Sequence, residues 1–181
     1  MTSHSASVPV RAEQRMGGPD WVTVAASVGA AVNAGVFFAF SAFIMPAVHD
    51  LPAAQGIEAM QALNRTAVAP FTVTGFGTAL LCVVVIVRAS RRLGTAPGRW
   101  MLGGAVVYLV AAIMITFVAN VPISSSIDAL NPSSTDAEAR WADLYTQWVS
   151  WNHLRALGSI GAATALAIAL RPSRSSSGRR P

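Results

Sequence analysis

Charged residues are scarce in this sequence. Only 12% of its 181 residues are Asp, Glu, Lys or Arg, while 53% are hydrophobic. An ordinary soluble domain has about a quarter of its residues charged, so the composition argues against that class. The length corresponds to one domain, and we predict an integral membrane protein.

Several chemistry-bearing motifs are absent as well. The sequence has one cysteine, Cys82, so no CxxC motif or disulfide relay can form within one chain. Because Cys82 lies in an apolar stretch, we expect it to be a packing residue. A GxSxG nucleophile elbow is also lacking. No metal or haem site is predicted. His49 and His153 share a predicted side, but neither lies deep in a helix and the spans contain no carboxylate.

Four long uncharged stretches predict four membrane-spanning helices. About 20 helical residues cross the ~30 Å hydrocarbon core of a bilayer. Continuous apolar runs favour helices over the alternating strands of a barrel. The fourth stretch is long enough only when it carries Asn152, His153 and Arg155 into the membrane edge. The expected spans cover about residues 21–48, 67–87, 100–122 and 148–170.

The predicted fold class is all-α, an integral membrane four-helix bundle that occupies residues 21–171. The outer loop at 49–65 is expected to be partly helical, and Pro122 is expected to end the third helix. A further helix, capped by Thr135 or Asp136, is expected to continue through the fourth span.

The arginines indicate how the bundle is oriented. They concentrate in the tails 1–20 and 172–181 and in the loop between the second and third spans, whereas the other two loops carry most acidic residues. The positive-inside rule therefore places both termini in the cytoplasm of a plasma-membrane protein. Both tails lack periodicity, so we expect disorder there. Basic and aromatic residues are not interleaved, so we expect membrane lipids and no nucleic acid as partners.

Uncommon polar residues gather at the predicted outer end. Arg155 lies about 24 Å and Asn120 about 30 Å from the inner ends of their helices, close to the outer boundary. Asn64 precedes the second span on that side, and Asn33 lies nearer the middle of the membrane. Their convergence predicts a polar pocket in the outer half of the bundle.

One face of the fourth helix combines aromatic and polar side chains. Arg155 on this face either turns into the bundle or extends outward to lipid phosphates. Its shared face with Asn152 and Ser159 favours the inward orientation. At alternating spacings of four and three, the face consists of Trp141, Tyr145, Trp148, Asn152, Arg155 and Ser159.

Simpler structural roles remain open for the other polar residues. His153 points about 100° away from Asn152 on the helix and is also suited to the membrane interface. Asn33 is suited to an interhelical hydrogen bond. Asn120 is suited to capping carbonyls near the end of its helix, and Asn64 to the N-cap of the second helix.

Five short segments carry a resemblance to a known family. The chain resembles the anthrone-oxygenase-like family of small four-span membrane proteins, long catalogued as a domain of unknown function. The resemblance covers about residues 22–170, in the expected order and without departure. The segments are 35–41 (GVFFAFS), 45–47 (MPA), 59–65 (AMQALNR), 120–122 (NVP) and 148–155 (WVSWNHLR).

The resemblance implies an activity and a site. Relatives in polyketide pathways oxidise anthrones to anthraquinones with O₂ and no recognised cofactor, so no cofactor is expected. For such chemistry His153 would be the general base, and Arg155 with Asn152 would stabilise the enolate oxyanion. Trp148, Trp151 and Phe side chains of the first helix would pack on the flat substrate. The substrate-binding set is completed by Asn33, Asn64 and Asn120.

A non-enzymatic role is the competing interpretation. The bundle would then bind a lipophile, assist a transporter or support a partner, with Arg155 fixing helices or binding a lipid head group. The partners expected are membrane lipids and, for an enzyme, a lipophilic small molecule and O₂. The sequence is also compatible with an oligomer.

Overall fold

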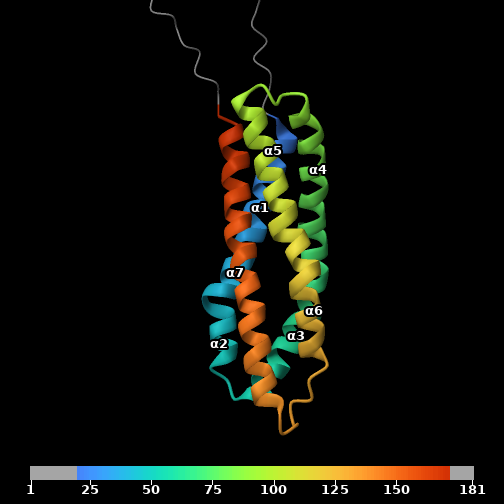
Figure 1. The fold of residues 1–181 in the computed structure, drawn as a ribbon, viewed down its shortest axis with the longest axis vertical. Coiled ribbons are helices and arrows are strands. Elements are labelled where there is room, and N and C mark those ends of the chain that lie inside the picture. Colours follow the sequence, from blue (N-terminus) through green and yellow to red (C-terminus); the bar gives the residue numbers. More distant parts are fainter. Residues whose placement is uncertain (1–19, 172–181) are drawn as a thin grey trace, which may run out of the picture.

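The structure is a computed structural model that describes residues 20–171. These residues form four long helical rods that pack side by side into an elongated bundle, without a β-strand in that range (Figure 1). The predicted all-helical fold is confirmed. The predicted tails lie outside the described residues, apart from Asp20. The rods run Trp21–His49, Ala53–Ser90, Ala96–Asp128 and Ala137–Ala169.

Three of the four rods contain π-helical segments, and the fourth is the single α-helix α7 (Ala137–Ala169). The first rod comprises α1 (Trp21–Ala39), η1 (Phe40–Ile44) and α2 (Met45–His49). The second comprises α3 (Ala53–Phe71), η2 (Thr72–Phe76) and α4 (Gly77–Ser90). The third comprises α5 (Ala96–Tyr108), η3 (Leu109–Met114), η4 (Thr116–Asn120) and α6 (Val121–Asp128).

Two predicted helix ends are wrong. The loop after the first rod is short, and α3 already begins at Ala53, so Asn64 lies inside a helix and is not an N-cap. The third rod continues past Pro122 as far as Asp128. The expectation that the outer loop at 49–65 is partly helical is confirmed, and Met60 is buried on its apolar face. The segment after Pro122 is helical as well because Ile127 is buried in the same core cluster.

Prolines and π-helical segments adjoin one another. Pro46 follows η1, Pro70 lies just before η2, and Pro122 follows η4. A proline has no N–H, and its ring clashes with the carbonyl four residues earlier in a regular α-helix. A π-helical turn bonds to the fifth preceding residue and is wider. The carbonyls four residues before Pro46 and Pro122 belong to Ala42 and Val118, which lie in η1 and η4, so the wider turns accommodate these two prolines. The corresponding residue for Pro70 is Thr66, which lies in α3 before η2, so the same account does not apply there.

Three rods are long and apolar enough to cross a membrane, namely Trp21–His49, Ala53–Ser90 and Ala96–Asp128. The fourth rod is not among them, since Asn152, His153 and Arg155 interrupt its apolar part.

The rods are arranged in a ring in which α1 packs against α7 and α4, and α5 packs against the same two helices. The first described residue and the last lie at the same end of the bundle as the loop between α4 and α5 (Figure 1). A salt bridge of 2.8 Å between Arg88 Nη1 and Asp20 Oδ1 joins α4 to the start of α1 at this end.

Two apolar clusters fill the interior at different heights. One includes Ala26 and Leu166 toward the end that carries the chain termini, and the other includes Met45 and Trp148 toward the opposite end. Between them, buried polar side chains interrupt the third and fourth rods. We call these residues the polar layer: Thr116, Asn120, Asn152 and Arg155.

Candidate functional site

Arg155 lies at the centre of the polar layer. Only 7% of the residue is exposed, and its Nη1 donates a hydrogen bond to Thr116 Oγ1 at 3.0 Å. Its Nη2 donates to Asn152 Oδ1 at 2.6 Å. The guanidinium carbon lies 4.2 Å from the centre of the Phe37 ring and 5.6 Å from that of Trp148. Arg155 therefore faces the bundle interior, and the alternative in which it extends to lipid phosphates is wrong.

The guanidinium lacks a carboxylate partner among the described residues. The two salt bridges found there are Arg88–Asp20 and Arg140–Asp136. The Nε atom of Arg155 also lacks a hydrogen-bond partner within residues 20–171. Arginine stays protonated and offers five N–H donors. A buried guanidinium with unused donors favours an anion or an electron-rich oxygen as its partner.

Asn152 fixes the arginine from the opposite side. Its Nδ2 donates to the Phe37 carbonyl and to Ser41 Oγ, both at 2.8 Å. A carbonyl only accepts, so the amide nitrogen must face Phe37 and the amide oxygen must face Arg155. The first rod thus orients the guanidinium through Asn152, which is fully buried.

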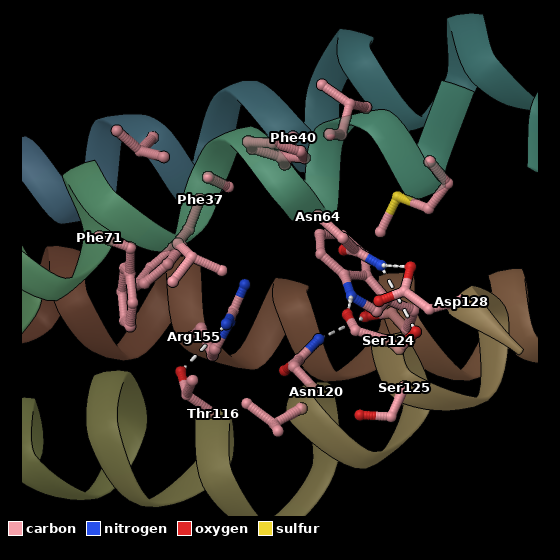
Figure 2. A pocket seen from close by; sticks show the side chains of 17 residues that line it. Phe37, Phe40, Asn64, Phe71, Thr116, Asn120, Ser124, Ser125, Asp128 and Arg155 are labelled. Atoms are coloured by element: carbon pink, nitrogen blue, oxygen red, sulfur yellow. Dashed lines mark hydrogen bonds between the residues drawn. The ribbon is translucent and has the colours of Figure 1, made fainter. Parts of the chain in front are cut away.

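A cavity of about 270 Å³ lies against Arg155 (Figure 2). Figure 2 shows Arg155 at one end of it, beside Thr116, and Asp128 at the other end. Apolar walls with a few converging polar groups are typical of small-molecule sites. The cavity is lined by Val36, Phe37, Phe40, Met60, Leu63, Asn64, Ala67, Val68, Phe71, Thr116, Asn120, Val121, Ser124, Ser125, Asp128, Trp148 and Arg155.

A polar stripe runs along one side of the cavity. It consists of Thr116, Asn120, Ser124 and Asp128, each four residues after the last, and all four line the cavity. Ser124 Oγ accepts a hydrogen bond from Trp148 Nε1 at 3.1 Å. Asp128 Oδ1 accepts one from Asn64 Nδ2 at 2.9 Å. The stripe therefore extends from the buried arginine to an exposed carboxylate at the other end of the cavity.

Asn120 has one satisfied and one unsatisfied amide atom. Its Nδ2 donates to the Trp148 carbonyl at 3.2 Å, while its buried Oδ1 has no partner among the described residues. A buried acceptor without a donor is costly. A ligand with an O–H or N–H group would satisfy it.

The structure brings together most of the residues predicted to form the site. Arg155, Trp148, Asn64 and Asn120 line the cavity, and Asn152 bonds to the arginine. The predicted face of the fourth helix is likewise turned inward: Trp141, Trp148, Asn152, Arg155 and Ser159 are buried, and Tyr145 is half-buried.

Three predicted residues lie elsewhere. His153 and Trp151 are exposed on α7 and do not line the cavity. Residues two apart on a helix point about 200° apart, so His153 and Arg155 cannot face the same cavity. Asn33 exchanges hydrogen bonds with Thr74 of η2, donating to its carbonyl at 3.3 Å and accepting from its hydroxyl at 3.2 Å. The interhelical interpretation of Asn33 is therefore confirmed.

Several functional positions were missed. Sequence reasoning named Asn120 alone from the polar stripe, although the four-residue spacing also identifies Thr116, Ser124 and Asp128. Phe71 was not singled out because nothing local distinguishes it from other apolar residues.

Histidines and acidic residues do not form a metal-binding cluster within residues 20–171. His49 stacks on Tyr145, with ring centres 4.3 Å apart, at the end of the bundle remote from the chain termini.

Comparison with known proteins adds one finding. Residues 69–165, more than half of the chain, match the model of a family described as anthrone oxygenase. The matched part contains the polar stripe and the α7 residues of the cavity, but not α1. No curated protein and no solved structure matches the chain. Because the match covers more than half of the chain, this chain belongs to the anthrone oxygenase family.

Proposed function

We propose that this protein oxidises a lipophilic polycyclic or phenolic substrate with O₂ in the cavity beside Arg155. The observation that carries the proposal is a buried guanidinium, without a carboxylate partner among the described residues, at the end of an aromatic-lined cavity. Family membership supports the reaction class.

We also propose four spans in the cytoplasmic membrane, with both termini in the cytoplasm. Arg88, Arg91 and Arg92 lie near the loop at the end that carries the termini, whereas Asp50 and Asp136 lie in the loops of the opposite end. This asymmetry follows the positive-inside rule. The inward orientation of Arg155 supports a fourth span, because its charge is kept away from lipid.

The cavity suits a flat ligand with one electron-rich oxygen. The rings of Phe40 and Trp148 lie 5.7 Å apart at a tilt, and Phe71 lies 5.8 Å from Phe37. These rings provide aromatic contact area. The unused N–H donors of Arg155 would receive the ligand oxygen. The volume of about 270 Å³ is near the lower end of small-molecule pockets.

Arg155 would act by stabilising an enolate. A positive charge in a site of low dielectric lowers the pKa of a C–H group conjugated to the bound carbonyl. The enolate carbon then gives electrons to O₂, a C–O bond forms, and protonation yields a hydroperoxide. Loss of water converts the original CH₂ group into a carbonyl. One oxygen atom remains in the product and the other leaves as water, so O₂ is the only oxidant required.

Asp128 is the group that we assign to receive the proton. It is the only carboxylate among the described residues that line the cavity. It lies 12 residues after Thr116 on one continuous rod, about 18 Å further along. Asp128 would therefore receive the proton indirectly, through groups that lie between it and the substrate. His153 is not used in this proposal.

The test is O₂ uptake by the detergent-purified protein with a simple anthrone. Arg155→Gln should lower the rate by roughly 10²- to 10³-fold, as does the loss of an oxyanion-stabilising donor. The rate of Arg155→Lys should lie between those of wild type and Arg155→Gln, because lysine keeps the positive charge but lacks the planar guanidinium with its several N–H donors. His153→Ala should leave uptake unchanged, as should the matched control Arg65→Gln, an exposed arginine of α3.

Equal uptake by wild-type protein and Arg155→Gln would contradict the proposal. A large loss in His153→Ala with a retained fold would restore His153 as the base. An absorption spectrum of the same preparation would detect a bound chromophore.

A binding function without chemistry is the second candidate. It is favoured by one observation: among the described residues, Arg155 is hydrogen-bonded only to the neutral side chains of Thr116 and Asn152, neither of which can act as a base. Saturable anthrone binding without protein-dependent O₂ uptake would support this function.

A further inference from the structure

The Arg155 guanidinium lines the cavity and has more N–H donors than hydrogen-bond partners among the described residues; we call its unused N–H groups its free edge. The guanidinium carbon lies over the Phe37 ring, 4.2 Å from its centre, and 5.6 Å from the centre of the Trp148 ring. A cation over the face of an aromatic ring is attracted by the ring quadrupole, which does not remove its positive charge. One N–H of Nη1 goes to Thr116 and one of Nη2 goes to Asn152, so each keeps a second N–H for a ligand, while Nε–H is buried without a partner among the described residues.

We infer that this edge binds a small monovalent inorganic anion, of the halide class, when no organic ligand occupies the cavity. A cation that is 93% buried is costly unless an opposite charge accompanies it. Arginine cannot relieve that cost by losing its proton. Its two hydrogen-bonded acceptors are neutral, so they orient the guanidinium without neutralising it.

The same surroundings limit the charge of the anion. Arg155 is the only cation among the described residues that line the cavity, so a single negative charge neutralises the buried end. A divalent anion would leave an excess negative charge there. The unpaired Asn120 Oδ1 and the Asp128 carboxylate in the same cavity would oppose that excess. The site should therefore prefer bromide or chloride to sulfate.

The inference uses the guanidinium of the proposed function but none of its oxygen chemistry. An organic oxyanion that binds Arg155 would have to displace the halide, so the two ligands compete. Halide binding would hold equally for an enzyme and for a binding protein, and its test needs no substrate.

Tryptophan fluorescence of the full-length protein in a non-ionic detergent provides the test. Bromide is titrated against gluconate at constant ionic strength. Exposed tryptophans such as Trp21 should give linear collisional quenching, whereas Trp148 should give a component that saturates. Trp148→Phe should lose the saturable component. Arg155→Gln should raise the half-saturating bromide concentration by roughly tenfold or more, as expected when a charge-assisted hydrogen bond is lost.

Thermal melting gives a second readout that does not depend on a folded Arg155 variant. Bromide in place of gluconate should raise the melting temperature of the wild-type protein by mass action, and sulfate should raise it less. Arg65→Gln, which removes an exposed arginine outside the cavity, should respond like wild type.

The inference would be overturned by linear quenching together with the same melting temperature in bromide and in gluconate. Saturable quenching that persists unchanged in Arg155→Gln would overturn it too. An equal response to sulfate would overturn the preference for one charge.

Discussion

Thr116 contributes one hydroxyl to the site, and that hydroxyl accepts the hydrogen bond from Arg155 Nη1 at 3.0 Å. Thr116→Val keeps the shape but leaves a buried charged donor unpaired, so we expect a loss of about 1–3 kcal/mol in stability. Thr116→Ser keeps the acceptor and should stay close to wild type. Thermal melting in detergent measures both. Equal melting temperatures for the Val and Ser variants would show that the hydroxyl does not support Arg155.

At the residue scale, the inward face of the fourth helix was predictable but its partners were not. Arg155 and Asn152 are rare in an apolar stretch and share a face by spacing, so the sequence reveals both. A threonine is common in apolar helices, so Thr116 is revealed only by its four-residue spacing from Asn120, Ser124 and Asp128. The Phe37 carbonyl carries no side-chain signal at all, although Asn152 bonds to it.

At the element scale, prolines and polar loops misled the sequence reading. Proline normally ends or kinks a helix, yet the rod continues past Pro122 through η4 and α6. The segment after Pro52 is expected from the sequence to be partly helical, but not to continue without a break into the second span as it does from Ala53, with Ile57 and Met60 buried. Gln61 Nε2 then bonds to the Ile127 carbonyl at 3.1 Å and holds α3 against α6. Such tertiary contacts are not visible in local sequence.

The close packing of η3 against α7 makes a second prediction. A Cβ atom added at Gly158 would overlap the Cβ of Ala111. Gly158→Ala should therefore destabilise the bundle by about 1–3 kcal/mol, as overpacking usually does. Gly161→Ala is the matched control one turn later, where no heavy atom lies within 4 Å. The measurement is thermal melting of both variants, and equal midpoints would contradict the packing argument.

At the scale of the whole molecule, the rods are longer than a bilayer is thick. They contain 29, 38, 33 and 33 residues, or about 44 to 57 Å at 1.5 Å per residue. The hydrocarbon core is only ~30 Å thick, so part of the bundle must lie outside it. The number and order of the rods follow from the apolar stretches. The apolar stretches do not predict that the rods extend beyond the membrane, because this extension depends on packing between α3, α6 and α7.

The proposed topology yields a prediction for the whole bundle. In a Cys82→Ala background, Ser133→Cys in the loop before α7 should react with a membrane-impermeant maleimide from outside intact cells. Leu93→Cys in the loop between α4 and α5 should react only after permeabilisation. Both positions are exposed, whereas native Cys82 is buried and serves as the unlabelled control. The opposite labelling pattern would invert the orientation, and equal labelling of both sites would argue against it.

The π-helical segment η4 has a consequence for how such a cavity can change. Thr116 belongs to η4, and Ser124 and Asp128 lie beyond it in α6. Each helical residue turns the chain by about 100°. Deleting one residue from η4 would thus turn α6 relative to α5 and carry Asp128 off the cavity wall, while α5 kept its own packing. In related chains, a single insertion or deletion in η4 would therefore change which α6 side chains line the Asp128 end of the cavity, while Arg155 kept its place.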